Sequence, residues 1–448
     1  MTTLESTQLI EYVTQQRWYG AKTRALSAAD VVDTVVIRGA DPELVLSLVE
    51  VRYETGAHDI YQLLYATHGE EVSVDGIAGD PGLARELVSA MRAGLTLQGG
   101  EGIVEFRSAE DFSALSRELG AARLVGTEQS NSSVVFDESV ILKIFRRLEP
   151  GINPELEMLR FLGEHGFQNI AALGGWYGYA GGPLAATLGI LQEYVSAGVE
   201  GWQLALDEVG TAPARFLDRL HRLGEVTGQM HSVLASDPND VAFAPEEPSV
   251  EALALLTATV DEEIARVFVS LPDDDERLAP IAGRGEEVRE QLRLLAQAGS
   301  TGRVIRTHGD YHLAQTLYAE NDWVILDFEG EPARSLVERR RKRSPLRDVA
   351  GMLRSFAYAT TAAALARGIE PPDDWEARAR ERFLEGYFDT VDPTLLPPGQ
   401  LAVERLLSVF ELEKAVYELR YELDNRPDWV GIPVAGIQRL IETATETA

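Results

Sequence analysis

The stretch HGDYHLAQ, residues 308–315, places an aspartate, two histidines and a glutamine within eight residues. Asp310 carries a carboxylate that can take a proton from a hydroxyl group. Gln315 offers an amide oxygen five residues later, and Asp327 follows the apolar run WVIL, which predicts the end of a buried strand. Carboxylate and amide oxygens suit a hard cation such as Mg²⁺. A base and a metal site of this kind are what phosphoryl transfer requires.

Each of these residues also has a structural interpretation. A single aspartate at a strand end usually makes a turn or caps a helix. His308 and His312 are explained most simply as structural hydrogen-bonding groups. Two histidines with an acid could also form a zinc site.

A lysine within an apolar strand is the second chemical feature. Lys143 stands in VILKIF, after the small polar stretch GTEQSNSSVV. Backbone N–H groups and hydroxyls of such a hairpin could contact phosphate oxygens. Glu157, fourteen residues after Lys143, lies on a predicted helix from which it could hold the lysine. The alternatives are an edge-strand lysine that reaches solvent and a glutamate on a solvated helix face. The hairpin candidates are Ser130, Asn131, Ser132 and Ser133.

The elements that must position these residues fall into three segments. Residues 1–85 predict a helix and antiparallel strands, because apolar and polar residues alternate between turns. Residues 86–198 predict a sheet with one helix, for which Asn153 is the N-cap, Pro154 the first residue and Gly166 the residue past the end. Residues 199–448 are mostly helical apart from a strand pair between His308 and Asp327. We therefore expect an α+β protein of three domains with these boundaries, bilobal around a cleft.

Composition excludes several classes of function. The 448 residues include 72 acidic and 41 basic side chains, for a net charge of −31, which repels nucleic acid and anionic membranes. There is no cysteine, hence no disulfide, thiolate metal site or cysteine nucleophile. No signal peptide or run of eighteen apolar residues is seen, so we expect a soluble cytoplasmic protein. The basic run ERRRKRS, residues 338–344, is expected to pair with acids or to lie near phosphates.

The order of these features resembles that of the aminoglycoside-phosphotransferase and protein-kinase-like superfamily. Within it, nearly the whole chain resembles the bacterial maltokinases. The segments that carry this resemblance are QRWYGAK, EQSNSSVVF, LKIFRRLEPGINPELE, HGDYHLAQTL, LDFEGEPARSLVERRRKRSPLRDVAGMLRSFAYA and FELEKAVYELRYELDNRPDWVGIP. The resemblance implies a bilobal, protein-kinase-like α+β fold with an N-terminal cap domain, an intermediate nucleotide-binding sheet domain and a helical C-terminal lobe.

The resemblance also implies an ATP- and Mg²⁺-dependent sugar kinase and a role for each matched residue. Asp310 would be the base. Lys143 would bind phosphates with Glu157 as its helix partner. The superfamily commonly has asparagine where this chain has Gln315, which puts the metal geometry at that position in doubt. The implied metal ligands are Gln315 and Asp327, with Glu329 as an additional carboxylate, and further nucleotide contacts are Glu193 and Val195.

The acceptor sugar is less defined. Maltokinases make maltose 1-phosphate for glycogen or α-glucan synthesis, and we expect maltose. A related family with the same cap phosphorylates glucosamine on its 6-hydroxyl, and this alternative stays open. A catalytically inactive binding module is a third hypothesis, against which the presence of Lys143 and Asp310 argues. A trehalose–maltose isomerase could dock on the chain, and the oligomeric state is not defined.

A sugar pocket needs carboxylates or amides for the hydroxyls and an aromatic ring for the pyranose face. The segment AVYELRYELDNRPDWV supplies such side chains, although helix packing or a turn explains each of them equally well. The candidates are His312, Tyr417, Glu418, Tyr421, Arg426 and Trp429.

Overall fold

The computed structural model describes residues 6–69, 71–109, 112–126, 131–182, 184–272, 275–295 and 302–445. The chain divides into two compact units. Unit 1 comprises Met1–Glu164 and Ile170–Ala197, and unit 2 comprises His165–Asn169 and Gly198–Ala448. The first two predicted domains therefore lie together in unit 1.

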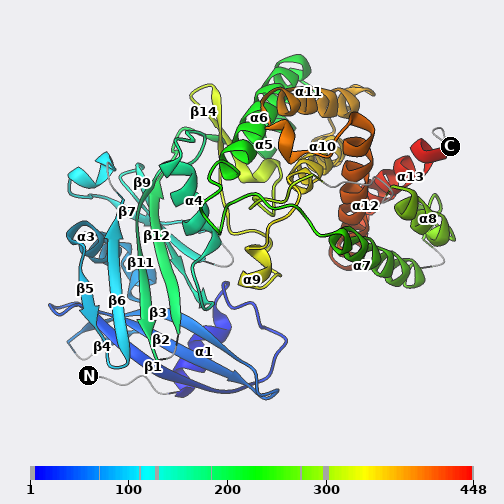
Figure 1. Ribbon diagram of the computed structural model, residues 1–448. Coiled ribbons are helices and arrows are strands. Elements are labelled where there is room, and N and C mark those ends of the chain that lie inside the picture. The colour runs from blue at the N-terminus through cyan, green and yellow to red at the C-terminus, as the bar shows by residue number, and fades with distance from the viewer. Residues whose placement is uncertain are drawn as a thin grey trace. The chain divides into compact units, whose positions relative to one another are not determined.

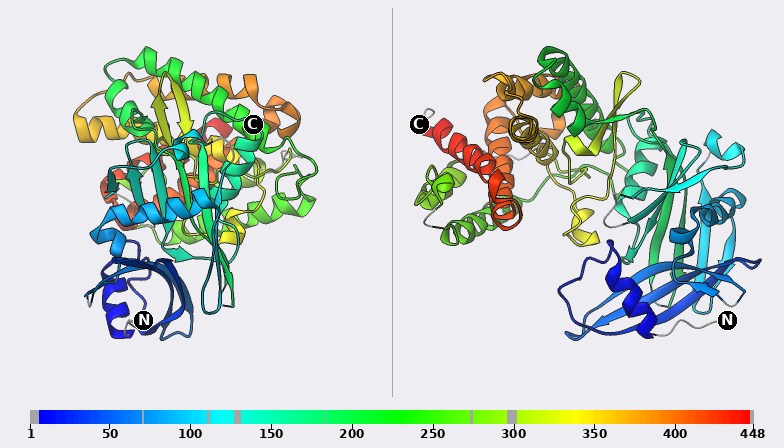
Figure 2. Two further views of the ribbon diagram at one scale, coloured as in Figure 1. Left: turned by 90° about the vertical axis from the view of Figure 1, so that its left-hand side faces the viewer. Right: turned by 180° about the vertical axis from the view of Figure 1, so that it is seen from behind.

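Unit 1 begins with a helix on a curved antiparallel sheet (Figures 1 and 2). The strands pair in the order β1-β2-β3, as their alternating pattern predicted. Leu9 and Val13 of the helix are buried in one apolar core with Trp18 and Tyr61. The elements of this part are α1 (Ser6–Gln15), β1 (Leu26–Arg38), β2 (Glu43–Tyr53), β3 (His58–His68), β4 (Glu71–Ser73), α2 (Gly76–Gly79) and α3 (Arg85–Ala93).

A second sheet of seven strands completes unit 1, in the order β5-β6-β11-β12-β9-β8-β7. One helix follows the β8-β9 hairpin and begins at Pro154, where the Asn153 side chain accepts a hydrogen bond from the backbone N–H of Glu155 (2.8 Å). Gly166 has φ +76° just past the helix end, so the predicted start and stop signals are confirmed. The elements are β5 (Thr96–Gln98), β6 (Gly102–Ser108), β7 (Ala122–Leu124), β8 (Asn131–Phe136), β9 (Val140–Phe145), α4 (Pro154–Glu164), β11 (Leu173–Gly181) and β12 (Ala185–Glu193).

The two sheets of unit 1 are joined by a buried ion pair and a short strand. The Arg146 guanidinium donates to the Asp75 carboxylate at 2.6 Å, and both side chains are almost completely buried. The amide of Gln62 on β3 donates to two carbonyls of the second sheet at 2.9 and 2.8 Å. Strand β10 (Arg147–Leu148) also pairs with β3. The strand that carries Lys143 is thus continuous with the N-terminal sheet.

Unit 2 is mostly helical, with a small sheet in the order β13-β14-β15. Helices α6 and α11 approach so closely that a Cβ on Gly224 would lie 2.0 Å from the Phe383 carbonyl oxygen. Helices α7, α8, α12 and α13 share a separate apolar core. The elements are β13 (Val199–Glu200), α5 (Gly201–Glu208), α6 (Pro213–Leu234), α7 (Val250–Val269), α8 (Gly285–Leu295), β14 (Thr316–Ala319), β15 (Asp322–Ile325), α9 (Leu336–Arg339), α10 (Leu346–Arg367), α11 (Trp375–Thr390), α12 (Gln400–Asn425) and α13 (Gly431–Thr445).

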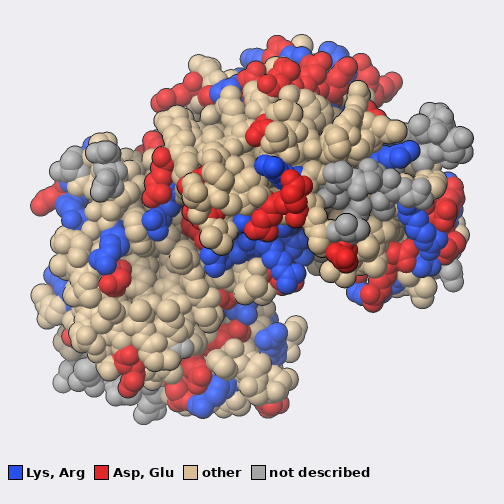
Figure 3. Space-filling view, in the orientation of Figure 1, with Lys and Arg blue, Asp and Glu red and all other residues tan. Residues whose placement is uncertain are grey.

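The surface of unit 2 reflects the charge of the chain. A band of acidic side chains covers the upper edge of Figure 3, over α6 and α11. Basic side chains gather over α9 and its neighbouring loops. None of the helices among the described residues combines the length and apolar character needed to cross a membrane.

We predict that Arg146→Gln lowers the free energy of unfolding by about 3–5 kcal/mol, because it leaves a buried carboxylate without its counter-charge. Urea denaturation followed by tryptophan fluorescence measures the loss. Arg147→Gln is the matched control, since Arg147 is half exposed and pairs with Asp59 at 2.8 Å. It should cost less than about 1 kcal/mol. Equal losses in the two variants would contradict a structural role for the buried pair.

Candidate active site

In unit 1 the strand lysine is held by a glutamate of the following helix. Lys143 lies on β9 between Ser133 of β8 and Ile190 of β12 in the strand register. Its Nζ donates to Glu155 Oε1 at 2.7 Å, with the Glu155 side chain 1% exposed. The hydrogen bond from the Glu155 backbone to the Asn153 cap fixes the start of this helix. The lysine head group is therefore fixed in position, as phosphate binding would require.

The predicted helix partner, Glu157, was wrong by two positions. Two residues along a helix turn the side chain by about 200°, so Glu155 and Glu157 face nearly opposite sides. Glu155 is buried whereas Glu157 is half-buried. The sequence did contain the signal: Glu155 precedes Met158, Leu159 and Leu162 at helical spacing, and all three are buried. A carboxylate on an apolar stripe needs a buried partner.

The other nucleotide candidates lie on the same sheet. Asn131, Ser132 and Ser133 belong to β8, and Ser132 Oγ accepts a hydrogen bond from Arg146 Nε at 2.8 Å. Ser130 lies outside the described residues. Exposed Glu193 ends β12, and Val195 follows it. Their contacts with a nucleotide remain predictions.

In unit 2 a buried carboxylate holds the loop that carries Asp310. Asp348, near the start of α10, accepts hydrogen bonds from the backbone N–H groups of His308 (2.8 Å) and Gly309 (2.9 Å). His231 of α6 contacts the same carboxylate at 3.2 Å. His308 bonds through Nε2 to the Leu326 carbonyl oxygen (2.8 Å), so one imidazole links the two acidic loops. The structural interpretation of His308 is supported by these bonds.

Asp310 itself is half-buried and lies among positive charges. Its carboxylate oxygens lie 3.8 Å from His312 Nε2 and 3.9 Å from Lys414 Nζ. Burial by itself raises the pKa of this carboxyl group. The contact and charge of His312, with the charges of Lys414 and His308, outweigh burial and lower the pKa to about 2. Asp310 is therefore an ionised hydrogen-bond acceptor at neutral pH.

The predicted metal ligands of unit 2 lie together. The amide of Gln315 donates to Asp327 Oδ2 at 3.1 Å, and oxygens of Asp327 and Glu329 lie within 4.8 Å of each other. Asp327 follows the end of β15 and has φ +60°, an uncommon conformation for a residue other than glycine. Arg339 donates to the Glu329 carbonyl at 3.2 Å. Two carboxylates and an amide fit the oxygen preference of Mg²⁺.

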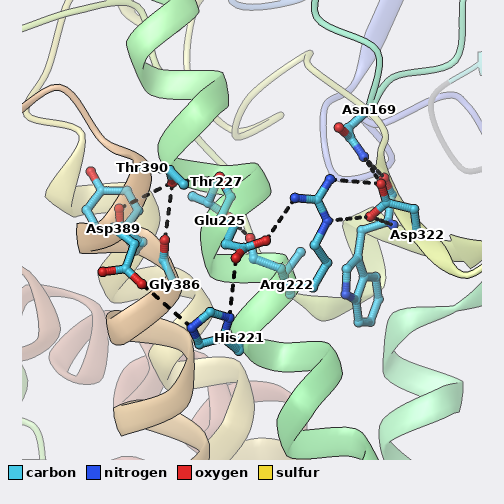
Figure 4. Close-up of polar contacts among 12 residues, drawn as sticks. Asn169, His221, Arg222, Glu225, Thr227, Asp322, Gly386, Asp389 and Thr390 are labelled. Carbon is cyan, nitrogen blue, oxygen red and sulfur yellow. Dashed lines mark hydrogen bonds and ion pairs between the residues drawn. The ribbon is translucent and has the colours of Figure 1, made fainter.

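A polar network fastens the strand pair between Gln315 and Asp327 to α6 (Figure 4). Arg222 donates to both carboxylate oxygens of Asp322 at 2.9 Å and to Glu225 at 2.9 Å. The Asn169 amide donates to Asp322 Oδ2 (3.1 Å) and to the Trp323 carbonyl (2.7 Å). Because Asp322 is the first residue of β15, these bonds fix the start of the strand that leads to Asp327.

A pocket of about 320 Å³ lies beside the Asp310 loop, lined only by residues of unit 2. Gly309 and Tyr311 form part of its wall. One face of α12 forms another part, because its lining residues recur at three- and four-residue intervals. These residues are Phe410, Glu413, Lys414, Val416, Tyr417 and Arg420.

Of the sugar-binding candidates on α12 and after it, the structure brings only Tyr417 to this pocket. Glu418 lies on the neighbouring face, where it accepts two hydrogen bonds from Arg354 of α10 (2.6 and 3.0 Å). Arg426 pairs with Glu422 and lies over the rings of Tyr421 and Trp429. Side-chain type had suggested an acceptor-site role for Glu418, Tyr421, Arg426 and Trp429. The pocket lining includes none of these four residues. Lys414 lines the pocket and was missed.

Two residues of the basic run 338–344 pair with acids, as was expected of this run. Lys342 contacts Glu246 at 2.5 Å and the Val241 carbonyl at 2.8 Å. Arg339 lies 3.9 Å from Glu329. The loop after Asp327 is thus held by side chains of this run.

Comparison with known proteins agrees with this geometry. Residues 121–393, more than half of the chain, match the phosphotransferase enzyme family, and residues 12–92 match the maltokinase N-terminal cap domain. The chain therefore belongs to the phosphotransferase enzyme family. It is an ATP-dependent kinase with the protein-kinase-like fold, and its acceptor is a sugar hydroxyl.

Among curated relatives, a glucosamine kinase of Streptacidiphilus jiangxiensis is 27% identical over 441 residues, which cover 91% of this chain and 97% of that protein. A glucosamine kinase of Mycolicibacterium smegmatis is 25% identical over 346 residues, covering 72% and 81%. A solved glucosamine kinase in complex with glucosamine, ADP and inorganic phosphate superposes with a TM-score of 0.74 at 21% identity, covering 98% of this chain and all of that one. This last similarity concerns the fold.

We predict that Glu155→Gln reduces kcat/KM for ATP by about a hundredfold, because Lys143 loses the ion pair with Glu155 that holds it in the phosphate-binding position. Glu157→Gln is the matched control, with the same substitution on the same helix. It should stay within about threefold of wild type, since a half-buried side chain on the opposite side does not hold the lysine. Steady-state kinetics at saturating acceptor measures both. A larger effect for Glu157→Gln would restore the original assignment.

We predict that Asp348→Asn lowers kcat by about a hundredfold with little change in Mg·ATP affinity. One of the two carboxylate oxygens that accept hydrogen bonds from the backbone of the Asp310 loop is lost, and Asp310 then moves. The buried N–H left without a partner should also cost about 1–3 kcal/mol of stability. Turnover, nucleotide titration and thermal melting measure the three quantities. Asp389→Asn, an exposed aspartate on α11, is the control. Unchanged kcat in Asp348→Asn would refute this positioning role.

Proposed function

We propose that the protein is a Mg·ATP-dependent glucosamine kinase that transfers the γ-phosphate to the 6-hydroxyl of the sugar. The observation that carries this choice is the alignment with a glucosamine kinase along 97% of that protein. The volume of the pocket beside Asp310, about 320 Å³, agrees with it. Small-molecule pockets span about 300–1,000 Å³, so this one suits a single sugar ring better than a disaccharide.

In the proposed reaction Asp310 accepts a hydrogen bond from the acceptor hydroxyl and orients its oxygen toward the γ-phosphorus. A new O–P bond forms, the bond between the γ-phosphorus and its bridging oxygen breaks, ADP leaves, and the hydroxyl proton passes to Asp310. The low pKa of Asp310 suits orientation more than strong proton abstraction, which agrees with a loose transition state. Lys414 and His312 keep this carboxylate ionised.

Mg²⁺ would be held by Asp327, Glu329 and Gln315, and it would neutralise charge on the phosphate oxygens. Lys143, held by Glu155, would bind phosphate oxygens. Tyr417 and Phe410, whose rings lie against the guanidinium groups of Arg420 and Arg347, line the pocket and would give it aromatic surface for the sugar.

Maltose is a second candidate acceptor, because residues 12–92 match the maltokinase N-terminal cap domain. The resemblance of the whole chain to the maltokinases also favours maltose. The curated relatives support glucosamine more strongly.

We predict that a coupled ADP-release assay gives a kcat/KM for glucosamine at least about a hundredfold above those for glucose and maltose. Asp310→Asn should reduce turnover of glucosamine by at least about a thousandfold while Mg·ATP still binds, because the variant loses the carboxylate that positions the hydroxyl. Nucleotide binding is measured by titration calorimetry. A preference for maltose would reject the proposed acceptor, and wild-type turnover in Asp310→Asn would reject the mechanism.

A further inference from the structure

Arg343 is placed in the pocket by the backbone of the catalytic segment. The Arg343 N–H donates to the Ile305 carbonyl at 2.7 Å, and the Ile305 N–H donates to the Arg343 carbonyl at 2.9 Å. Ile305 lies three residues before His308, so this isolated bridge ties Arg343 directly to the loop that carries Asp310. The half-buried side chain of Arg343 lines the pocket.

Each of the other cationic side chains that line the pocket forms an ion pair with an acidic side chain. Arg343 forms none with the described residues. Arg343 makes no side-chain hydrogen bond or ion pair with any residue in the part of the chain that the structure describes. Arg343 thus contributes a positive charge that has no direct ion-pair partner among the described residues. The matched pairs are Arg334 with Glu331, Arg339 with Glu329, Arg347 with Glu413, Arg420 with Glu263 and Lys414 with Asp310.

The surroundings of Arg343 are unfavourable for its own charge. Burial lowers the pKa of this guanidinium first, and the charges of Arg347 and Arg334 lower it further. Glu413 and Glu331 offset only part of this effect, and the pKa falls to about 10. An anion bound among the three guanidinium groups would remove the repulsion between them. Guanidinium groups also bind phosphate through paired N–H donors.

We propose that Arg343, flanked by Arg334 and Arg347, forms a subsite for a phosphate dianion inside the acceptor pocket. The phosphate comes either from the phosphorylated sugar product or from free inorganic phosphate. The proposal rests on the proposed function only for the identity of the sugar phosphate. The subsite would bind the phosphate group of the phosphorylated sugar, and free phosphate would compete with the product for the subsite.

The test measures binding without turnover, so that it does not depend on the acceptor assay. Inorganic phosphate and glucosamine 6-phosphate are titrated separately into wild-type protein saturated with Mg·ADP, which keeps the nucleotide site filled. Arg343→Gln should weaken binding of the phosphate source by roughly tenfold or more. Arg341→Gln is the matched control, because this arginine is exposed, lies two residues earlier and does not line the pocket. It should bind as wild type does.

Each outcome decides the proposal. Weaker binding of both probes in Arg343→Gln supports a subsite for the shared phosphate group. Loss confined to glucosamine 6-phosphate identifies the product as the source, and loss confined to inorganic phosphate identifies the free ion. No binding to wild type, or equal binding to Arg343→Gln, overturns the proposal.

A measurement on wild-type protein covers the case in which the variant does not fold. Phenylglyoxal modifies accessible arginines, and peptide mass spectrometry follows each site. The bound probe should slow modification of Arg343 at least about tenfold and leave Arg341 unchanged, because the anion would occupy the guanidinium donors. Equal rates at Arg343 with and without both probes would also overturn the subsite.

Discussion

The catalytic half of the site depends on one buried carboxylate. Asp348 is almost completely inaccessible to solvent, and a charge in that position is tolerable only with donors around it. Two backbone N–H groups of the HGD loop and an imidazole of α6 supply those donors. Asp348 of α10 therefore holds the loop and α6 in place, because its buried charge needs the hydrogen-bond donors that they supply. Gly309, with φ +87°, gives the loop the turn in which both N–H groups reach the same carboxylate.

The residues that the sequence predicted correctly belong to local patterns. The Asn153 cap, the Pro154 start and the Gly166 stop act within one helix, and the structure confirms all three. Gln315 and Asp327 come together because a hairpin of two short strands joins them, and a strand pair was expected there. The Glu157 error has the same origin. Spacing along the chain located the helix, but the choice between two glutamates depended on which side of that helix faces the sheet.

The acceptor site could not be predicted in the same way, because its residues are selected by long-range contacts. Tyr417 and Glu418 are neighbours in sequence but lie on different faces of α12. One lines the pocket and the other is buried against Arg354, 64 residues away. Side-chain type alone suggested sugar binding for both. Lys414 shares the pocket face with Tyr417, yet nothing local marks it as a neighbour of Asp310.

The charges that line the pocket bear more directly on the binding of acceptor and product than the net charge of the chain does. Most cations in the lining are neutralised by a nearby acid, so a glucosamine acceptor with its ammonium group would meet little net repulsion. In the proposed reaction, transfer replaces a neutral hydroxyl with a phosphate dianion, and the charge of the amino sugar changes sign. A single guanidinium without a counter-charge then favours the product over the acceptor. Such a difference in affinity draws the reaction toward phosphorylated sugar at the active site, and it slows release by the same free energy. On this argument the balance between transfer and release lies with Arg343, a residue that takes no part in the chemical step.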